Sequence, residues 1–115
     1  MSHQGSCHCG KISFSVSGEI DSLTECNCSL CSKRGGLLWF VGRDQLQLKS
    51  PDSELPTYRF NTHKIAHHFC DVCGCSPFSE APGPDGRLMA AVNARCLDDV
   101  DLSPFKIVPW NGRDH

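Results

Sequence analysis

The amino-acid sequence predicts a mainly β fold in which small antiparallel sheets are organised around zinc. Two observations carry this prediction. Short stretches with the composition of strands recur about every ten residues, with turn-forming sequences between them. In addition, nine of the 115 residues are cysteines, and eight of the nine fall in three short clusters. A β-rich chain of this size builds a modest core, so support from a bound metal is expected.

The predicted strands follow from alternation of polar and apolar residues. In residues 11–17 the alternation places Ile12, Phe14 and Val16 on one face of a half-buried strand. The apolar run at residues 37–42 is nearly continuous, which is typical of a buried strand. The last predicted strand, residues 106–110, either closes the sheet or packs across it. The remaining predicted strands are residues 45–50, 57–61, 64–69, 88–94 and 106–110.

Helical signals are limited to two short stretches. Residues 29–35 predict one or two helical turns, with Ser29 as the N-cap and Gly35 as the stop. Residues 97–104 predict a short turn. Neither stretch is long enough to organise a core, and no repeat or domain boundary is visible. Residues 1–115 are therefore expected to form a single domain.

Charge and hydropathy argue against several classes of function. The formal net charge is −2 and the sequence pI is about 6.3, without a basic patch, so nucleic acid is not an expected partner. No apolar run approaches the length of a membrane span. The N-terminus lacks the apolar region of a secretory signal. We therefore expect a cytoplasmic protein, as a monomer or a homodimer.

The cysteine content fits either a secreted disulfide scaffold or an intracellular thiolate metal protein. Three features favour the metal protein. The number of cysteines is odd, no export signal is visible, and the C-x-C spacings are unfavourable for pairing within a cluster.

The most specific local motif is Cys70-x-x-Cys73 followed by Gly74, the pattern of a zinc-knuckle turn. The tight turn converges the two sulfurs, and glycine supplies the positive φ that such turns require. A tetrahedral structural zinc needs two further ligands. Cys7 and Cys9, just before the first predicted strand, are the obvious candidates. The sequence therefore predicts a closed structural zinc site.

A second, open zinc site is predicted at Cys26, Cys28 and Cys31. Catalytic zinc sites keep three protein ligands and leave the fourth position to water or substrate. A zinc ion with three thiolates carries a formal charge of −1, so it is a weak Lewis acid but binds a soft thiol as thiolate. Thiol chemistry is thus more natural here than hydrolysis, with an aldehyde as the electrophile. Candidate donors that orient the aldehyde oxygen are Asn27, Ser29 and Asn93.

Several residues near these clusters keep more than one interpretation. Cys75 could be the fourth ligand of either site, and Cys96 fits a small buried hydrophobe. His67 and His68 precede the knuckle, and strand alternation sends one inward and one outward, as ligand or as support for a ligand. His8 is expected to point away from the metal. An iron–sulfur cluster at the three-cysteine motif is less favoured, because four cysteines are the usual ligand set.

Four sequence blocks, GSCHCGKISFSV, ECNCSLCSKRGG, HHFCDVCGCSPF and AVNARCLDDVDL, follow one another along the chain. In order and spacing they resemble the glutathione-dependent formaldehyde-activating enzyme and centromere protein V family, over about residues 5–105. The resemblance implies a β-tent fold with two zinc ions. It implies a structural zinc at Cys7, Cys9, Cys70 and Cys73 and a catalytic-type zinc at Cys26, Cys28 and Cys31.

The activity that names the family is the condensation of formaldehyde with glutathione to S-hydroxymethylglutathione, a carbon–sulfur lyase reaction. The resemblance therefore implies small thiol and aldehyde substrates. Residues that would bind the glutathione carboxylates are not readable from the motifs, and Lys33, Arg34 and Arg95 are the basic candidates.

Two other functions remain open from the sequence. The first is a non-catalytic zinc module that binds a protein partner, with the second zinc closed by Cys75 or a histidine and the LLWF run, residues 37–40, as a contact surface. The second is a redox or metal-buffering protein that releases zinc when the three-cysteine motif is oxidised. Exchange of the second zinc with added thiols distinguishes the enzyme from the binding module.

Overall fold

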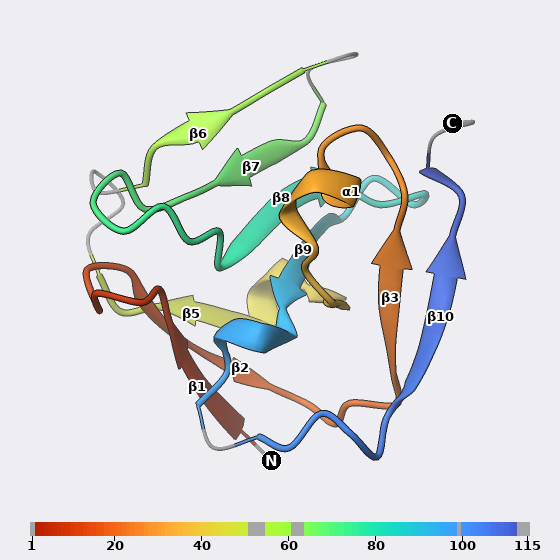
Figure 1. Ribbon diagram of the computed structural model, residues 1–115, viewed down its shortest axis with the longest axis horizontal. Coiled ribbons are helices and arrows are strands. Elements are labelled where there is room, and N and C mark those ends of the chain that lie inside the picture. Colours follow the sequence, from red (N-terminus) through yellow and green to blue (C-terminus); the bar gives the residue numbers. More distant parts are fainter. Residues whose placement is uncertain (1, 51–54, 61–63, 99, 113–115) are drawn as a thin grey trace.

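The computed structural model describes the chain except residues 1, 51–54, 61–63, 99 and 113–115. Strands dominate the described part, and the helices are single turns (Figure 1). The helical elements are α1 (Cys31–Arg34), η1 (Arg43–Gln45) and η3 (Ala94–Cys96). The strands are β1 (Ser2–Ser6), β2 (Ser13–Ser17), β3 (Ser22–Cys26), β4 (Leu38–Gly42), β5 (Leu46–Leu48), β6 (Thr57–Tyr58), β7 (Ala66–His68), β8 (Phe78–Pro82), β9 (Leu88–Asn93) and β10 (Lys106–Trp110).

The strands form two sheets. A three-stranded sheet has the order β1-β2-β5, and a seven-stranded sheet has the order β10-β3-β4-β9-β8-β7-β6. All pairs are antiparallel except β10 with β3, which run parallel side by side in Figure 1. The expected antiparallel pairing is confirmed for the other pairs, and the one parallel pair makes the larger sheet mixed. The connection from β9 returns the chain to the end of the sheet where β3 begins, so β10 must run in the direction of β3.

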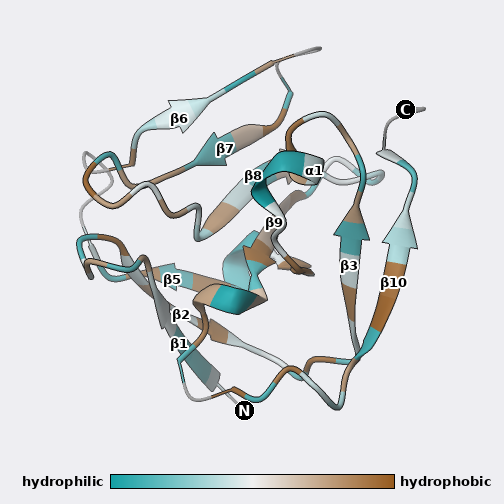
Figure 2. Ribbon diagram, viewed as in Figure 1, coloured by the Kyte–Doolittle hydropathy of each residue, from teal (hydrophilic) through white to brown (hydrophobic). Residues whose placement is uncertain are grey.

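Buried apolar side chains from both sheets form the main core. Phe14 of β2 packs against Phe78 of β8, with ring centroids 6.0 Å apart. Trp39 and Val41 of β4 are buried, whereas Phe40 between them is 52% exposed. The apolar run at 37–42 is thus a strand with one buried face, not one buried on both faces as expected. Figure 2 shows apolar segments on β9 and on the edge strand β10.

A smaller core surrounds the first cysteine group, which consists of Cys7, Cys9, Cys70 and Cys73. Cys7, Ile12 and Cys70 are buried together, and Cys73 and Cys75 pack against them partly buried. These thiols come from segments on either side of the β2–β5 region of the chain. The sulfur-bearing turns therefore contribute directly to the packing that joins the N-terminal sheet to the knuckle.

The predicted strands at 11–17, 37–42, 45–50, 88–94 and 106–110 correspond to β2, β4, β5, β9 and β10. Two others are shorter than expected: β6 covers only the start of 57–61, whose last residue lies outside the described part, and β7 covers the middle of 64–69. β1, β3 and β8 were not predicted. Their sequences, SHQGS, SLTEC and FSEAP, lack a clear apolar alternation, and only pairing with neighbours makes them strands.

The predictions of one helical turn near residues 29–35 and of a turn within 97–104 were correct, and the predicted N-cap was wrong. The single turn α1 ends at Gly35 (φ 71°) as expected, but its N-cap is Leu30, without a side-chain hydrogen bond, and not Ser29. The described residues of 97–104 contain turns and no helix, and a short 3₁₀ helix precedes them as η3. No helix in the described part of the chain is long and apolar enough to cross a membrane.

Replacing Phe14 with alanine should destabilise the fold by about 3–5 kcal/mol, because the ring is 1% exposed and its loss leaves a cavity against Phe78. Replacing Phe40 with alanine should change stability by less than about 1 kcal/mol, because that ring is already half in solvent. Urea unfolding of both variants measures the difference. Equal losses of stability in the two variants would show that the main core does not lie around Phe14, as its burial indicates.

Candidate metal centres

The knuckle turn positions Cys70 and Cys73 as the sequence motif requires. Gly74 has a φ of 84° and donates its N–H to the Cys70 carbonyl at 2.9 Å, which closes the turn. The Cys70 sulfur accepts backbone N–H groups from Val72 and Cys73, both at 3.4 Å. Hydrogen bonds of this kind stabilise the thiolate form of the sulfur.

The loop between β1 and β2 forms a similar turn, in which a backbone N–H is also directed at a cysteine sulfur. Ile12 donates its N–H to the Cys7 sulfur at 3.3 Å, while the Cys7 N–H donates to the Ile12 carbonyl at 3.0 Å. Gly10, with a φ of 86°, makes the turn between them. Cys9 lies in this loop and is exposed. Two tight turns from distant parts of the chain thus present their sulfurs to one point.

The spacing of these sulfurs matches a tetrahedral zinc site. Cys7 and Cys9 Sγ are 3.7 Å apart, and Cys9 and Cys70 Sγ are 3.6 Å apart. All four sulfurs, including that of Cys73, lie within 4.8 Å of one another. Zinc–sulfur bonds of roughly 2.3 Å in a tetrahedron place sulfurs about 3.8 Å apart. The donor set and its geometry therefore fit a closed four-thiolate site.

The pKa values of Cys73 and Cys9 are shifted in opposite directions. The backbone N–H of Cys75 lowers the pKa of Cys73 to about 5. The backbone N–H of Lys11 acts to lower the pKa of Cys9, but desolvation and the neighbouring Cys70 and Cys7 thiols outweigh it and raise that pKa to about 11. Without a metal, some of these thiols therefore keep their protons and share them with neighbouring sulfurs. A divalent cation bound among the sulfurs would replace these protons.

The second group forms where β3 ends and α1 begins. The N–H of Cys28 donates to the Cys26 sulfur at 3.4 Å, and the N–H of Cys31 donates to the Cys28 sulfur at 3.3 Å. The three sulfurs lie within 4.8 Å of one another, and all three residues are half-buried. Within the described ranges, no fourth cysteine, histidine or carboxylate joins this group. It is therefore a three-ligand arrangement on that part of the chain.

Electrostatics differ between the members of this second group. Burial and the Cys28 and Cys26 sulfurs raise the pKa of Cys31. Burial also acts against the ionised form of Cys28, but backbone hydrogen bonds from Cys31 and Leu30 outweigh it and lower that pKa. A cation placed among these sulfurs would relieve the repulsion that keeps Cys31 protonated.

A cleft of about 530 Å³ opens beside the second group. Cys26 and Cys31 contribute to its wall, and the rest comes from the ends of β3 and β10 and from the glycines that follow α1. Two lining residues at the end of β10, Trp110 and Asn111, were not singled out from the sequence. A strand end with ordinary polar and aromatic residues carries no local signal, and only its pairing with β3 brings it here.

The C-terminal segment is held over the second group by specific contacts. The N–H of Asn27 donates to the Trp110 carbonyl at 3.2 Å, and the Asn27 side chain donates to the Asn111 Oδ1 at 3.0 Å. A Cβ atom at Gly112 would lie 2.6 Å from the Cys26 sulfur. Glycine at this position therefore lets the backbone pass directly across the sulfur.

The remaining cysteines and His8 lie outside both groups. The backbone of Cys75 supports the knuckle, since its carbonyl accepts the Cys70 N–H at 2.8 Å, but its sulfur joins neither group. Cys96 is half-buried in η3, and burial raises the pKa of its thiol to about 12. His8 is exposed.

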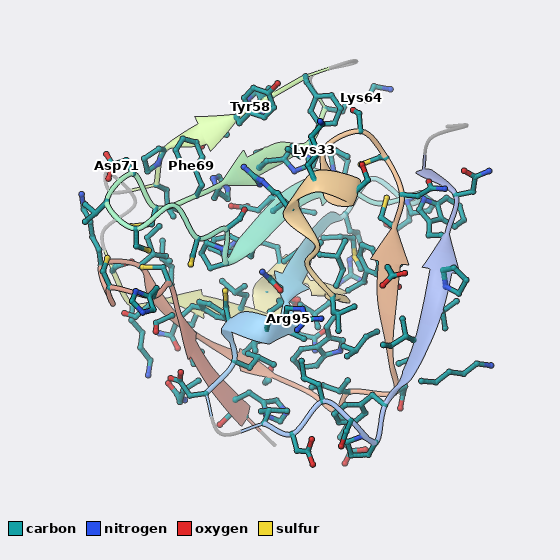
Figure 3. All side chains as sticks on the ribbon, viewed as in Figure 1. Lys33, Tyr58, Lys64, Phe69, Asp71 and Arg95 are labelled. Carbon is teal, nitrogen blue, oxygen red and sulfur yellow. The ribbon has the colours of Figure 1, made fainter. Side chains whose placement is uncertain are left out.

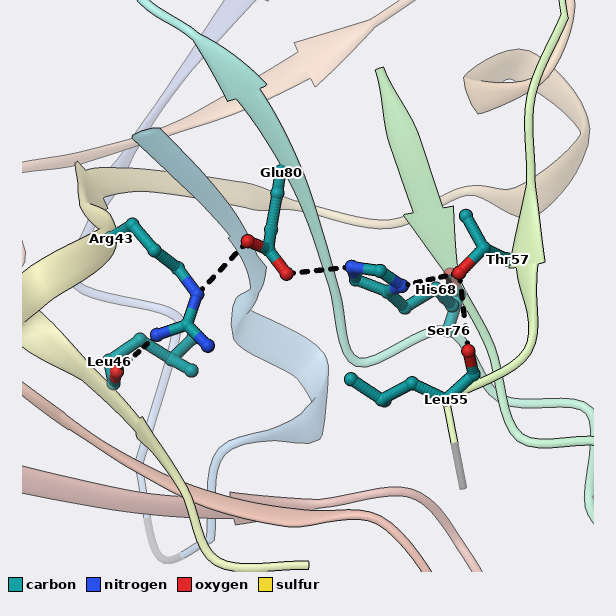
Figure 4. A network of polar contacts seen from close by, with 7 residues as sticks. All are labelled: Arg43, Leu46, Leu55, Thr57, His68, Ser76 and Glu80. Carbon is teal, nitrogen blue, oxygen red and sulfur yellow. Dashed lines mark hydrogen bonds and ion pairs between the residues drawn. The ribbon is translucent and has the colours of Figure 1, made fainter. Parts of the chain in front are cut away.

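The two adjacent histidines alternate as predicted, but both rings are buried. His68 faces the interior, where Nδ1 contacts the Thr57 hydroxyl at 2.9 Å and Nε2 contacts the Glu80 carboxylate at 2.7 Å (Figure 4). His67 lies on the opposite face, covered by the stacked ring of Phe60 at 5.4 Å. The expectation of an outward histidine was wrong because Phe60 shields that face. Neither ring joins a sulfur group.

The contact of His68 belongs to a polar network that sequence reasoning missed. Glu80 also pairs with Arg43 Nε at 3.1 Å, and Arg43 donates to the Leu46 carbonyl at 2.6 Å (Figure 4). The network joins β6, β7, β8 and η1. Its members are isolated polar residues in four separate segments, so no spacing in the sequence points to them.

The basic candidates for anion binding are not among the residues that line the cleft. Lys33 is on α1 and Arg95 is on η3 (Figure 3), and neither lines the cleft. Arg34 donates to the Ser76 hydroxyl at 2.7 Å. Of the predicted orienting donors, Asn27 lines the cleft and Ser29 does not. The Asn93 side chain instead donates to the Ser76 carbonyl at 3.1 Å.

Comparison with known proteins identifies the family of this chain and a similar fold. The model of the family described as glutathione-dependent formaldehyde-activating enzyme matches residues 2–109. The fold is similar to a crystal structure of a protein from Rhodobacter sphaeroides, with a TM-score of 0.80 and 26% identity, covering 94% of this chain and 99% of that one. Because the family model spans nearly the whole sequence, this chain belongs to the glutathione-dependent formaldehyde-activating enzyme family.

Proposed function

We propose that this protein is a zinc enzyme that adds a small thiol to formaldehyde or another aldehyde, or cleaves the resulting adduct. The observation that carries the proposal is a group of three half-buried cysteines, Cys26, Cys28 and Cys31, at the wall of a cleft. Membership of the family associates this arrangement with glutathione and formaldehyde. The proposal includes a single domain over residues 1–115, with a β-tent architecture and a cytoplasmic location.

Two zinc ions are part of the proposal. Cys7, Cys9, Cys70 and Cys73 would hold a structural ion, because their sulfur spacing fits a tetrahedron. Cys26, Cys28 and Cys31 would hold the second ion. When bound by three thiolates, zinc supplies an open position that accepts a soft sulfur ligand and favours its thiolate form.

The residues of the cleft have defined tasks in the addition. The carbon–sulfur bond forms between the thiol sulfur and the aldehyde carbon, and the thiol proton ends on the former carbonyl oxygen, without oxidation or reduction. Asn27 and Asn111, whose side chains bond to each other at the cleft, provide amide groups that orient this oxygen. Backbone hydrogen bonds from Cys31 and Leu30 outweigh burial and lower the pKa of Cys28, which favours its thiolate form.

One observation favours a second function, a zinc module that binds a protein partner. Phe40, within the LLWF run, is 52% exposed on the outer face of β4. This function also needs a closed second zinc site. Among the described residues, however, neither Cys75 nor a histidine completes the three-cysteine group. The open arrangement supports the enzyme better.

The stoichiometry of zinc tests both sites. We expect two zinc ions per chain, about one after Cys28→Ala with the fold retained, and unfolding or severe destabilisation after Cys70→Ala, since structural zinc contributes folding free energy directly. Cys96→Ala is the matched control and should keep both ions. Elemental analysis with circular dichroism measures metal and fold together. Two ions retained by the Cys28 variant would refute the second site.

Acidification should release the zinc ions in order. The lowered pKa of Cys73, about 5 against an ordinary 9.0, means that its thiolate stabilises the fold fully above pH 9.0 and that this contribution is lost as pH falls through about 5. The second ion would be held by three thiolates and the structural ion by four, so protonation of one cysteine removes a larger share of the ligands of the second ion. The second ion should therefore leave first, followed by the structural ion and the fold. A pH titration with a zinc indicator and circular dichroism measures this order, and simultaneous release would contradict it.

Activity can be measured as the rate at which thiol and formaldehyde exchange with their adduct, because the uncatalysed reaction also proceeds. Exchange spectroscopy by NMR should show acceleration by the zinc-loaded protein. Cys28→Ala should remove the acceleration, and Cys96→Ala should leave it intact. Absence of acceleration with every small thiol tested, in protein that holds two zinc ions, would favour the binding module.

A further inference from the structure

A buried histidine lies on the same face of the seven-stranded sheet as the second cysteine group. Side chains directly opposite one another on neighbouring strands point to the same face of a sheet, and so do residues two apart on one strand. Such pairs lead from β7 to β4 through His67–Ser79, Ser79–Ala91 and Ala91–Phe40. Leu38, two residues before Phe40, pairs with Thr24 of β3, and Cys26 follows Thr24 by two residues. His67 and Cys26 therefore share the face that is turned away from the main core.

The ring of His67 carries a buried polar atom that lacks a partner. The residue is 8% exposed, and its Nε2 has no hydrogen-bond partner in the described part of the chain. Burial and, to a smaller extent, the positive charge of Arg34 lower the pKa of the ring, so the ring is neutral at pH 7 and has one N–H to donate. A buried polar group of this kind destabilises the free protein and is satisfied when a ligand brings an acceptor.

Arg34 brings a positive charge to the same region. It is the last residue of α1, three positions after Cys31, and its neighbour Gly35 lines the cleft. Its Nη1 donates to the Ser76 hydroxyl at 2.7 Å, and that hydroxyl donates to the His68 carbonyl at 2.6 Å. The guanidinium is therefore held next to the backbone of β7. It has five N–H donors, and the contact with Ser76 uses one of them.

The charges around the cleft are divided between its two sides. Lys33 and Arg34 are exposed at the end of α1, beside the lining residue Gly35, whereas the carboxylate of Glu25 lies at the end of β3. An anionic group is therefore attracted to the α1 side and repelled from the β3 side. Arg34 lies about 4.5 Å from Cys31 along the helix axis. One residue of an extended peptide spans roughly 3.5 Å, so a carboxylate one residue away from a thiol reaches this turn.

We propose that Arg34 and His67 form a binding site for a carboxylate of the thiol substrate, between the end of α1 and β7. The guanidinium pairs with the carboxylate, and the Nε2–H of His67 donates to it, which supplies the partner that this nitrogen lacks. The substrate class is a peptide thiol whose carboxylate lies one residue from the sulfur-bearing residue. The inference rests on the proposed function and names two residues that determine its specificity.

Calorimetric binding of glutathione and of its diethyl ester to the zinc-loaded protein tests the site, because the two ligands share the thiol and differ in their carboxylates. Arg34→Gln should weaken glutathione binding about tenfold, the loss expected for one hydrogen bond to a charged group, and should change the affinity of the ester by less than about twofold. Arg87→Gln is the matched control. It removes an exposed arginine just before β9, at the opposite end of that strand from Asn93, and should change neither affinity.

The variant His67→Phe separates a binding role from a structural one. It keeps an aromatic ring against Phe60 and removes the unpaired nitrogen, so the ligand-free protein should melt at a higher temperature. Glutathione should nevertheless bind about tenfold more weakly, while binding of the ester stays the same. Thermal unfolding followed by circular dichroism and the same calorimetry measure the two effects. A less stable variant with unchanged glutathione binding would show that the histidine only supports the fold.

The outcomes separate this inference from the proposed function. If both thiols bind and Arg34→Gln leaves glutathione binding unchanged, or weakens both ligands equally, the carboxylate site is overturned while the proposed function stands. Binding of the ester alone has the same meaning. If neither thiol binds to protein that holds two zinc ions, the proposed function fails and this inference fails with it.

Discussion

The convergence of four sulfurs from two tight turns is the constraint on which the rest of the structure depends. Cys9 and Cys70 are 61 positions apart in sequence, yet their sulfurs lie 3.6 Å apart. Four such thiols cannot all ionise at that distance without a cation between them. The fold and a bound metal would therefore be coupled: the turns place the sulfurs, and a cation held between them would join the N-terminal sheet to the knuckle.

A second constraint, the parallel pairing of β10 with β3, gives the other cysteine group its surroundings. The pairing aligns Trp110 with Cys26, so that both strands end at the same place. The three-cysteine turn then meets the last residues of the chain, and a cleft results. The first group is closed by its four sulfurs, whereas the second is bounded by a strand end and leaves room for a small molecule. The same residue type thus packs in a small core in one place and lines the wall of a cleft in the other.

The local motifs could be predicted from the sequence, and the long-range partners could not. The spacing of Cys70 and Cys73 before a glycine fixes a turn whatever surrounds it, and C-x-C-x-x-C brings three sulfurs together by chain length alone. The network of His68 with Glu80, and the cleft wall at Trp110, depend on strand order and on a parallel pairing that no local pattern contains. The weak strands β1, β3 and β8 were missed for the same reason.

The position of β10 after the other described strands has a consequence for the order in which the protein is made. All four cysteines of the first group have been synthesised by residue 73, so that group can assemble while the ribosome still holds the remainder. The wall formed by Trp110 and Asn111 is synthesised after all of these cysteines. Until it pairs with β3, the three-cysteine turn has no cleft beside it. The nascent chain can therefore assemble the four-sulfur group well before the cleft forms.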